Sequence, residues 1–283
     1  MRTISVEPED RYVAGDGLRL HYLDWGGEGK PWLLLLHGGS QTAHTWDFFA
    51  DALRDEYHVI APDQRGHGDS GWSPGQDYSR EAALADLERL VRETGMDRPG
   101  FYLMGMSMGG LVSMVLAASR PEWVKGLVIV DIGPETRPRD GRRARKYGSR
   151  LQEGEFAEFE AEARQIYRRS RPEHRQRSLR FELKELPDGR WTWKADPRRY
   201  EGGRRVVRDL GELWQSLEAV RCPTLILRGE ISSMLADETA RRMQSLVPGS
   251  RYEVVPGAGH NIQGDKPEAL EAAVRAFLAD AGR

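Results

Sequence analysis

The sequence contains a single cysteine, Cys222, and almost no excess of charge of either sign. One cysteine excludes an internal disulfide framework and cannot build a metal site alone, so we interpret Cys222 as a small buried hydrophobic side chain. The histidines are scattered without the spacing of metal ligands, and we expect neither a metal nor another cofactor. A formal net charge of −2 at pH 7 argues against a general nucleic-acid-binding protein.

Long hydrophobic runs are also missing. The longest aliphatic runs, such as residues 32–36, are far too short to cross a bilayer. Residues 1–12 are polar and acidic and contain no apolar core of a secretion signal. We therefore expect a soluble, cytoplasmic protein with no membrane association. These observations leave its oligomeric state, monomer or homodimer, open.

Short apolar runs alternate along the chain with amphipathic segments. Runs typical of buried strands cover residues 17–24, 32–36, 58–62, 100–104, 126–131, 224–228 and 251–255. Segments with the periodicity of helices cover residues 46–54, 79–94, 107–118, 237–246 and 267–278. Continuous apolar strands that alternate with helices predict an α/β fold, in which a mostly parallel sheet is covered by helices on both faces.

The alternation stops between residues 134 and 215. This stretch has no convincing buried strand, and its 22 Lys and Arg against 15 Asp and Glu give it a net charge of +7, whereas the remainder carries −9. We predict a helical cap over residues 134–215, inserted after the sixth core strand, with residues 1–133 and 216–283 forming one core domain. The positive surplus favours docking of the cap on an acidic core, and it fits either a solvated arginine-rich surface or an anionic ligand drawn beneath the cap.

The most informative stretch is an apolar run over residues 101–104, followed by Gly105-Met106-Ser107-Met108-Gly109 and a helical pattern. This is the context of a nucleophile elbow, in which a serine lies on a strained turn between a strand and a helix. Glycines two residues to either side of the serine leave room for the close backbone approach that such a turn requires. Ser107 is therefore the candidate nucleophile, and the backbone N–H of Met108 is a candidate donor to an oxyanion.

Two further motifs follow predicted strands. The motif His37-Gly38-Gly39 comes after residues 32–36, and its glycines let the N–H of Gly39 point toward a substrate carbonyl as the second oxyanion donor. Residues 63–70, DQRGHGDS, come after residues 58–62. We expect a structural role there, with charged side chains tying the loop to the rim of the sheet, and we do not assign its histidine as a base.

The candidate base is His260, in the glycine-rich turn PGAGHN over residues 256–261. This turn follows the last predicted strand and precedes the last predicted helix, so it presents an imidazole at the carboxyl edge of the sheet. A neutral imidazole can take the proton of a serine and return it to a leaving group near neutral pH.

The order of these motifs resembles the α/β-hydrolase fold superfamily, in its capped branch of esterases, lactonases, cofactor-free haloperoxidases and C–C bond hydrolases. The resemblance covers residues 17–278 and rests on HGG at 37–39, DxRGHGxS at 63–70, GxSxGG at 105–110, VDIGP at 130–134 and GxGH at 257–260. It implies an eight-stranded, mostly parallel sheet and a triad of serine, acid and histidine. The serine argues against the haloalkane dehalogenases of this superfamily, which have an aspartate at the elbow.

The resemblance leaves the triad acid uncertain. In the family the acid usually follows the penultimate strand, three or four residues after a glycine, and those positions here hold Ser232 and Ser233. Asp131, at the end of the preceding predicted strand, is the favoured replacement, because some relatives use that position. Glu230 is the second candidate, Asp237 lies further along the chain, and the third alternative is that no acid serves.

The predicted function is a serine hydrolase that cleaves carboxylic esters or lactones, with an acyl-enzyme on Ser107 and His260 as general base. Two alternatives stay open: a C–C bond hydrolase of dienone ring-fission products, and a ligand-binding protein on a hydrolase scaffold that lacks the acid. We expect a largely apolar substrate pocket. Its candidate lining residues are Met106, Trp191, Trp193 and Trp214.

Overall fold

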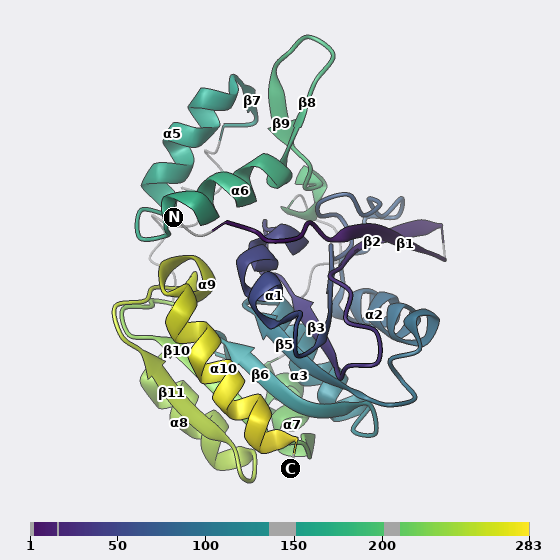
Figure 1. Ribbon diagram of the computed structural model, residues 1–283, viewed down its shortest axis with the longest axis vertical. Helices are drawn as coiled ribbons and strands as arrows, with labels where there is room; N and C mark the ends of the chain where they lie inside the picture. The colour runs from purple at the N-terminus through teal and green to yellow at the C-terminus, as the bar shows by residue number, and fades with distance from the viewer. Residues whose placement is uncertain (1–2, 16, 136–150, 201–209, 283) are drawn as a thin grey trace.

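The structure is a computed structural model that describes residues 3–15, 17–135, 151–200 and 210–282, and its centre is an eight-stranded sheet (Figure 1). Its strands are β1 (Glu9–Gly15), β2 (Leu18–Asp24), β3 (Trp32–Leu36), β4 (His58–Pro62), β5 (Phe101–Met106), β6 (Val124–Val130), β10 (Thr224–Gly229) and β11 (Arg251–Val255). The strand order is β1-β2-β4-β3-β5-β6-β10-β11, with antiparallel pairing at β1-β2 and β2-β4 and parallel pairing elsewhere. The predicted fold class is confirmed.

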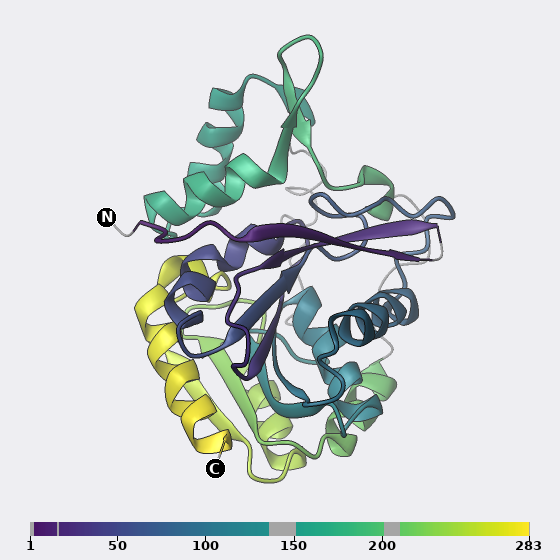
Figure 2. The same ribbon diagram turned by 45° about the vertical axis from the view of Figure 1, so that its right-hand side comes forward.

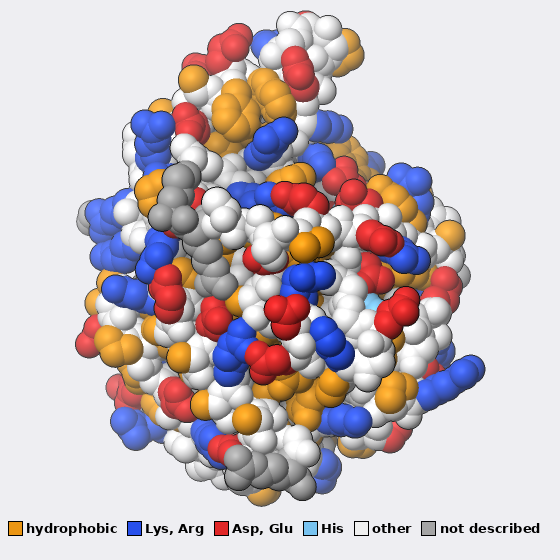
Figure 3. All heavy atoms as spheres, viewed as in Figure 1, with side chains coloured by type: hydrophobic (Ala, Val, Ile, Leu, Met, Phe, Trp, Pro, Cys, Tyr) orange, Lys and Arg blue, Asp and Glu red, His pale blue; other side chains and the backbone are white. Residues whose placement is uncertain are grey.

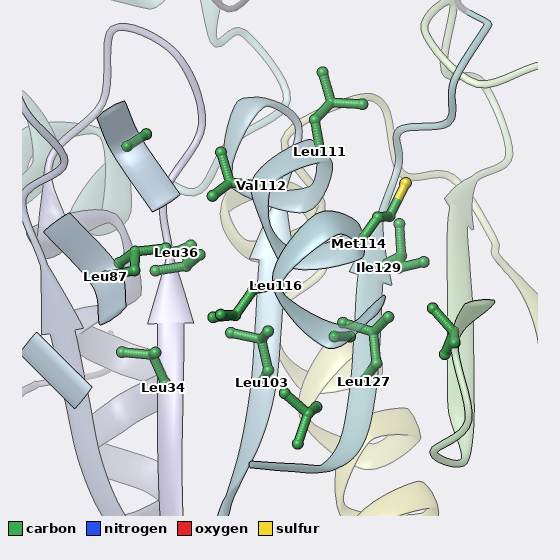
Figure 4. Packing of buried hydrophobic residues seen from close by; sticks show 14 of the residues in the cluster. Leu34, Leu36, Leu87, Leu103, Leu111, Val112, Met114, Leu116, Leu127 and Ile129 are labelled. Atoms are coloured by element: carbon green, nitrogen blue, oxygen red, sulfur yellow. The ribbon is translucent and has the colours of Figure 1, made fainter. Parts of the chain in front are cut away.

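Helices cover both faces of this sheet, because side chains alternate between the two faces along each buried strand. In β3, Leu34 and Leu36 belong to one apolar cluster, whereas Leu33 and Leu35 belong to the other. On the first face lie α2 (Arg80–Thr94), α3 (Met108–Ser119), α7 (Leu210–Ala219) and α8 (Asp237–Leu246), and on the second α1 (Asp47–Leu53) and α10 (Pro267–Ala281). Figure 4 shows Val112 and Leu116 of α3 above the leucines of β3, β5 and β6.

Strand β1 was not predicted from the sequence. It pairs with β2 along its whole length at the edge of the sheet, from Glu9 opposite Asp24 to Gly15 opposite Leu18. Among its residues only Val13 is buried. An edge strand held by backbone pairing needs no run of apolar residues, so its hydropathy pattern gives no signal.

A second unit lies above the carboxyl edge of the main sheet (Figures 1 and 2). It contains β7 (Glu153–Gly154), α5 (Phe156–Ile166), α6 (Pro172–Glu182), β8 (Leu183–Glu185), β9 (Trp191–Trp193) and the 3-10 helix η2 (Pro197–Tyr200). We call the described residues 151–200 the cap. Strands β7, β9 and β8 form a small sheet that was not predicted, and the expected boundary after residue 215 falls inside α7, which packs on α3 of the core.

The cap contacts the core through charged groups. The guanidinium of Arg177 on α6 pairs with the buried carboxylate of Asp47, and the hydroxyl of Tyr78 donates to the buried carboxylate of Asp196 in the cap. Just before α6 begins, Arg171 Nη2 lies 2.6 Å from Oε2 of Glu268, which belongs to α10 of the core. Elsewhere the face seen in Figure 3 carries interspersed charges of both signs. Cap cations therefore meet core carboxylates, in agreement with the opposite charges of the two parts.

Cys222 is 9% exposed and belongs to the larger apolar cluster, which confirms its interpretation as a buried hydrophobic side chain. Burial raises the pKa of its thiol to about 11. None of the described helices combines the length and apolarity needed to cross a bilayer.

Candidate active site

Ser107 lies at the turn between β5 and α3, and its backbone has a positive φ of 51° with a ψ of −115°. Few residues other than glycine adopt a positive φ, and such strain is concentrated at functional sites. The turn is held because Ser107 N–H donates to the carbonyl of Val130, at 3.1 Å. Gly109 is required by packing, since a Cβ there would lie 2.5 Å from the carbonyl oxygen of Leu36. The local sequence thus forms the predicted elbow.

Asp131 and His260 are brought together across the sheet, with His260 Nδ1 at 2.7 Å from Asp131 Oδ2. A carboxylate can only accept this bond, so Nδ1 is the donor and Nε2 is left as the acceptor. Asp131 directly follows β6 and is fully buried, and its φ is 51°. Its other oxygen accepts the N–H of Gly229 at 3.0 Å. These bonds fix both the carboxylate and the imidazole tautomer.

Ser232, at one of the two positions where the family resemblance indicates an acid, contacts the catalytic candidates directly. Ser232 lies in the loop after β10 and its hydroxyl donates to Asp131 Oδ2, the oxygen that also accepts from His260. The alternative acid Glu230 instead accepts the N–H of Gly257 at 2.8 Å. Asp237 accepts the hydroxyl of Tyr252 at 2.7 Å. Among the candidate acids, Asp131 is the one whose carboxylate contacts the histidine.

The loop after β3 lies beside the elbow. A Cβ built on Gly38 would lie 3.3 Å from Cβ of Ser107, so this backbone passes directly over the serine. Burial lowers the pKa of His37 and keeps its ring neutral; Nδ1 donates to the carbonyl of Gly38 at 2.8 Å, and Nε2 accepts the N–H of Gln64 at 2.9 Å. Gly39 is exposed next to this fixed turn, and Met108 is partly exposed at the first position of α3.

The loop over residues 63–70 has the structural character that was expected. Asp63 is buried and accepts the N–H groups of Ala43 and Asp69, at 2.7 and 2.9 Å. Arg65 forms two bonds to Asp86, at 2.6 and 2.9 Å. The buried ring of His67 bonds to backbone carbonyls and to a cap arginine, so both of its nitrogens already have structural partners.

One group of described side chains has the composition of a metal site. Atoms of His21, Asp63 and Asp69 lie within 4.8 Å of one another. Both nitrogens of His21 are already bonded to carboxylates, and Asp69 Oδ2 accepts from Lys194 Nζ of the cap at 2.6 Å. We assign this group a structural role, because its donors and acceptors satisfy one another.

A small cleft lies between the cap and the core, and Asn261, the residue after His260, is among those that line it. Its lining residues are Gln41, Thr45, Ala163, Tyr167, Ser170, His174, Arg175, Ser178, Leu179, Glu182, Asn261, Gln263 and Gly264. Most of them are polar, and neither Ser107 nor His260 is among them, so the apolar substrate pocket expected from the sequence stays a prediction. Hydropathy patterns do not detect such residues, although Gln41 lies two residues after the motif at 37–39 and Asn261 ends the glycine-rich turn at 256–261.

The aromatic residues expected to line the pocket lie elsewhere. Trp191 and Trp193 pack edge-on against Phe156 and Phe159 inside the cap, with ring centroids 5.1 and 5.3 Å apart. Trp214 belongs to α7 and packs in the core cluster. The buried apolar cluster of the cap consists of Phe159, Ala163, Leu179 and Leu183, and Trp191 and Trp193 pack against it while staying partly exposed.

Met106, the fourth expected pocket residue, is 3% exposed and packs in the core beneath the elbow. A Cβ on Gly38 would lie 2.5 Å from its sulfur, so it supports the loop over Ser107 from below. None of Met106, Trp191, Trp193 and Trp214 is among the residues that line the cleft.

Comparison with known proteins supports the fold described above. A model of the alpha/beta hydrolase fold family matches residues 31–267. The esterase Rv0045c of Mycobacterium tuberculosis is 32% identical over 270 residues, which cover 90% of this chain and 85% of the esterase. N-formylmaleamate deformylase of Pseudomonas putida is 30% identical over 274 residues, which cover 94% of this chain and 95% of the deformylase.

Solved structures show the same similarity. The crystal structure of E-2-(acetamidomethylene)succinate hydrolase matches with a TM-score of 0.85 at 25% identity, covering 96% of this chain and 99% of that one. The crystal structure of the Mycobacterium tuberculosis esterase Rv0045c matches with a TM-score of 0.76 at 27% identity, covering 96% and 91%. From the family match, the elbow and the strand order together, the chain belongs to the α/β-hydrolase fold family.

Proposed function

We propose that this protein is a serine hydrolase that cleaves carboxylic esters or lactones, with Ser107 as nucleophile, His260 as general base and Asp131 as the acid that orients it. The observation that carries the proposal is the 2.7 Å bond between His260 Nδ1 and the buried Asp131, at the sheet edge where Ser107 occupies a strained elbow. A carboxylate in this place stabilises the imidazolium that forms when the histidine takes a proton.

In this reaction Nε2 of His260 takes the hydroxyl proton of Ser107 while the serine oxygen attacks the substrate carbonyl carbon. The N–H groups of Met108 and Gly39 donate to the oxyanion of the tetrahedral intermediate. Collapse of the intermediate expels the alcohol, which receives the proton from His260, and leaves the acyl group on Ser107. Water, deprotonated by His260, then releases the carboxylic acid.

The names of the relatives support hydrolysis of a carbonyl compound and widen the range of substrates to be tried. One relative is named an esterase, another a deformylase of an N-formyl compound, and a solved neighbour a hydrolase of an acetamido compound. The alternative of C–C bond cleavage would use the same serine and histidine. Preference for a dienone ring-fission product over simple esters would favour that alternative.

The test uses p-nitrophenyl acetate with the purified protein, following both p-nitrophenol release and intact mass. We expect many turnovers, and a loss of at least a thousandfold in kcat for Ser107→Ala, because the nucleophile carries the covalent step. Ser119→Ala is the matched control, since this serine lies at the other end of α3 and bonds to helix carbonyls. Turnover that survives in Ser107→Ala would overturn the proposal.

A further inference from the structure

The peptide bond between Gly38 and Gly39 carries an N–H that the proposed function assigns to the oxyanion. Glycine has the freest backbone of all residues, so two in succession do not fix this peptide by themselves. The carbonyl of Gly38 accepts from His37 Nδ1 at 2.8 Å and from the N–H of Gln41 at 3.2 Å. In a planar trans peptide the C=O and the following N–H point in opposite directions, so these bonds set the direction of the Gly39 N–H.

The side chain of Gln41 holds the same turn from a second direction and begins a chain of hydrogen bonds. Its Oε1 accepts the N–H of Gly38 at 3.0 Å, and its Nε2 donates to Asn261 Oδ1 at 3.1 Å. Asn261 Nδ2 donates to Ser170 Oγ at 2.9 Å, and the hydroxyl of Ser170 donates to Asp265 Oδ1 at 3.0 Å. The turn after β3 is thus connected without a break to the carboxylate of Asp265.

All the bonds of this chain run in one direction. A backbone N–H can only donate and a carboxylate can only accept, so the two ends, at Gly38 and Asp265, fix the orientation of both amides and of the hydroxyl between them. Bonds aligned in this way polarise one another, and a carboxylate at the end strengthens them. Gln41 and Ser170 are 6% and 4% exposed, so water competes little for their side chains.

Ser170 is the member of the chain that the cap contributes. It lies just before α6, where the N–H of Arg171 also donates to the carbonyl of Gly264, at 2.9 Å. A Cβ on Gly264 would lie 2.6 Å from Ser170 Oγ and 2.4 Å from Asn261 Nδ2, so a side chain there would displace the bonded atoms. The loop after β11 is therefore shaped to receive Ser170 of the cap.

Asp265 holds the turn of the candidate base at the same time. Its Oδ2 accepts the N–H of Gly259, the residue before His260, at 2.8 Å, while its Oδ1 accepts from Ser170. One carboxylate thus binds both the turn that presents the imidazole and the cap residue that leads to the turn after β3. The cap is joined to both halves of the candidate site by a single network.

We propose that Ser170 of the cap is a positioning residue for the oxyanion donor, so that docking of the cap completes the oxyanion hole. It acts through Asn261 and Gln41 on the peptide that carries the Gly39 N–H. The inference rests on the proposed function, because it concerns the donor of that reaction. Hydrolysis is then confined to molecules whose cap is docked on the core, since a donor that is free to turn away stabilises the oxyanion less.

The first test is steady-state hydrolysis of p-nitrophenyl acetate. We expect Ser170→Ala to lower kcat at least tenfold and to change KM by no more than a few-fold, because oxyanion donors act chiefly in the transition state. Thr192→Ala is the matched control, since its hydroxyl also belongs to the cap but donates to the carbonyl of Gln152 within the cap, at 2.9 Å. A kcat for Ser170→Ala equal to that of the control would overturn the proposal.

A double-mutant cycle separates transmission along the chain from two independent losses. Gln41→Ala removes the acceptor of the Gly38 N–H and should lower kcat at least as much as Ser170→Ala. Because Ser170 acts through Gln41, we expect the double variant to be no more than about threefold slower than Gln41→Ala alone. Effects of the two substitutions that multiply in full would show that Ser170 does not act through this chain.

Amide hydrogen exchange at Gly38 measures the same coupling without a substrate. We expect Ser170→Ala to raise the exchange rate of this amide at least tenfold and Thr192→Ala to leave it unchanged. Hydrolysis that depends on Ser107, with neither kcat nor exchange altered by Ser170→Ala, would overturn this inference alone. Absence of ester hydrolysis by the native protein, with exchange at Gly38 that depends on Ser170, would instead overturn the proposed function and with it the assignment of the donor.

Discussion

Asp131 occupies the position that separates this chain from the commoner arrangement of its family. The proposed acid follows β6, while the position after β10 that the family resemblance indicates holds Ser232, whose hydroxyl donates to the same carboxylate. Asp131 therefore lies one strand away from that position, and Ser232 supports its carboxylate as a hydrogen-bond donor. The parallel strands β6 and β10 end at the same edge of the sheet, so an acid that follows either strand can reach the same histidine.

We expect Asp131→Asn to lower kcat at least a hundredfold and to change KM by no more than a few-fold. The amide cannot hold His260 in the correct tautomer or stabilise its charged form, but it removes no contact with substrate. The measurement is steady-state kinetics on a simple ester. Glu230→Gln is the control, since that carboxylate bonds to Gly257 rather than to the histidine. A kcat for Asp131→Asn close to that of the native protein would contradict this role.

At the scale of elements, the junction of β5 with α3 positions Ser107 because the helix starts in direct contact with the end of β3. Glycine at 109 permits this contact, and the neighbouring strand holds the serine through the carbonyl of Val130. The strain at Ser107 is therefore supported by packing on two sides. A small displacement of the first residues of α3 should therefore displace Ser107.

We expect Gly109→Ala to destabilise the protein by about 1–3 kcal/mol, because its Cβ would overlap the Leu36 carbonyl and α3 would have to shift. Urea unfolding gives the free energy of unfolding, and ester hydrolysis reports the displaced serine. Gly75→Ala is the matched control, since a Cβ there meets nothing within 4 Å. Equal stability of the two variants would contradict the close packing of the elbow.

Buried elements could be predicted well because burial imposes a pattern on their sequences. The apolar runs over residues 32–36 and 58–62 match β3 and β4 residue for residue, and the segment over 237–246 matches α8. Strand β1 is exposed for most of its length, and the short strands of the cap contain only one buried residue between them, so they have no such pattern. The helical prediction for the cap was incomplete for this reason.

The site could be predicted where a backbone motif fixes it and not where distant side chains meet. The places of Ser107 and His260 at the sheet edge follow from their motifs. Asp131 was the favoured of three alternatives, and its contact with His260 depends on the pairing of β6 with β10, which the sequence does not state. The cleft depends on contacts between α6 and the loops after β3 and β11, which lie far apart in the sequence. Tryptophans suggested a pocket wall because composition cannot distinguish the inside of a cap from its underside.

At the scale of the whole molecule, stability depends on pH through a buried charged pair near the cap. Burial acts to lower the pKa of His21, but its bonds to Asp63 and Asp10 outweigh burial and raise that pKa. Burial acts to raise the pKa of Asp63, yet the bond and charge of His21 outweigh it and lower that pKa. His21 therefore stabilises the fold fully at pH values below its ordinary pKa of about 6.5. Asp63 stabilises the fold fully at pH values above its ordinary pKa of about 4.

We expect His21→Gln to cost about 1–3 kcal/mol at pH 6 and less at pH 9, because the contribution of a histidine with a raised pKa is lost as the pH rises through that value. Urea unfolding of the native protein and the variant at both pH values gives the two differences. A difference in the free energy of unfolding that stays constant between pH 6 and pH 9 would show that the charge of His21 does not contribute.

The buried thiol of Cys222 makes the protein suitable for site-specific labelling. A pKa of about 11 leaves very little thiolate at neutral pH, and the thiol is buried. Maleimide and iodoacetamide reagents will therefore not react with Cys222 while the protein is folded. A cysteine introduced in place of Ser178, in the cleft, would then be the sole reactive thiol on the chain. A fluorophore attached there would report the arrival of a ligand in real time, with no need to remove the native cysteine first.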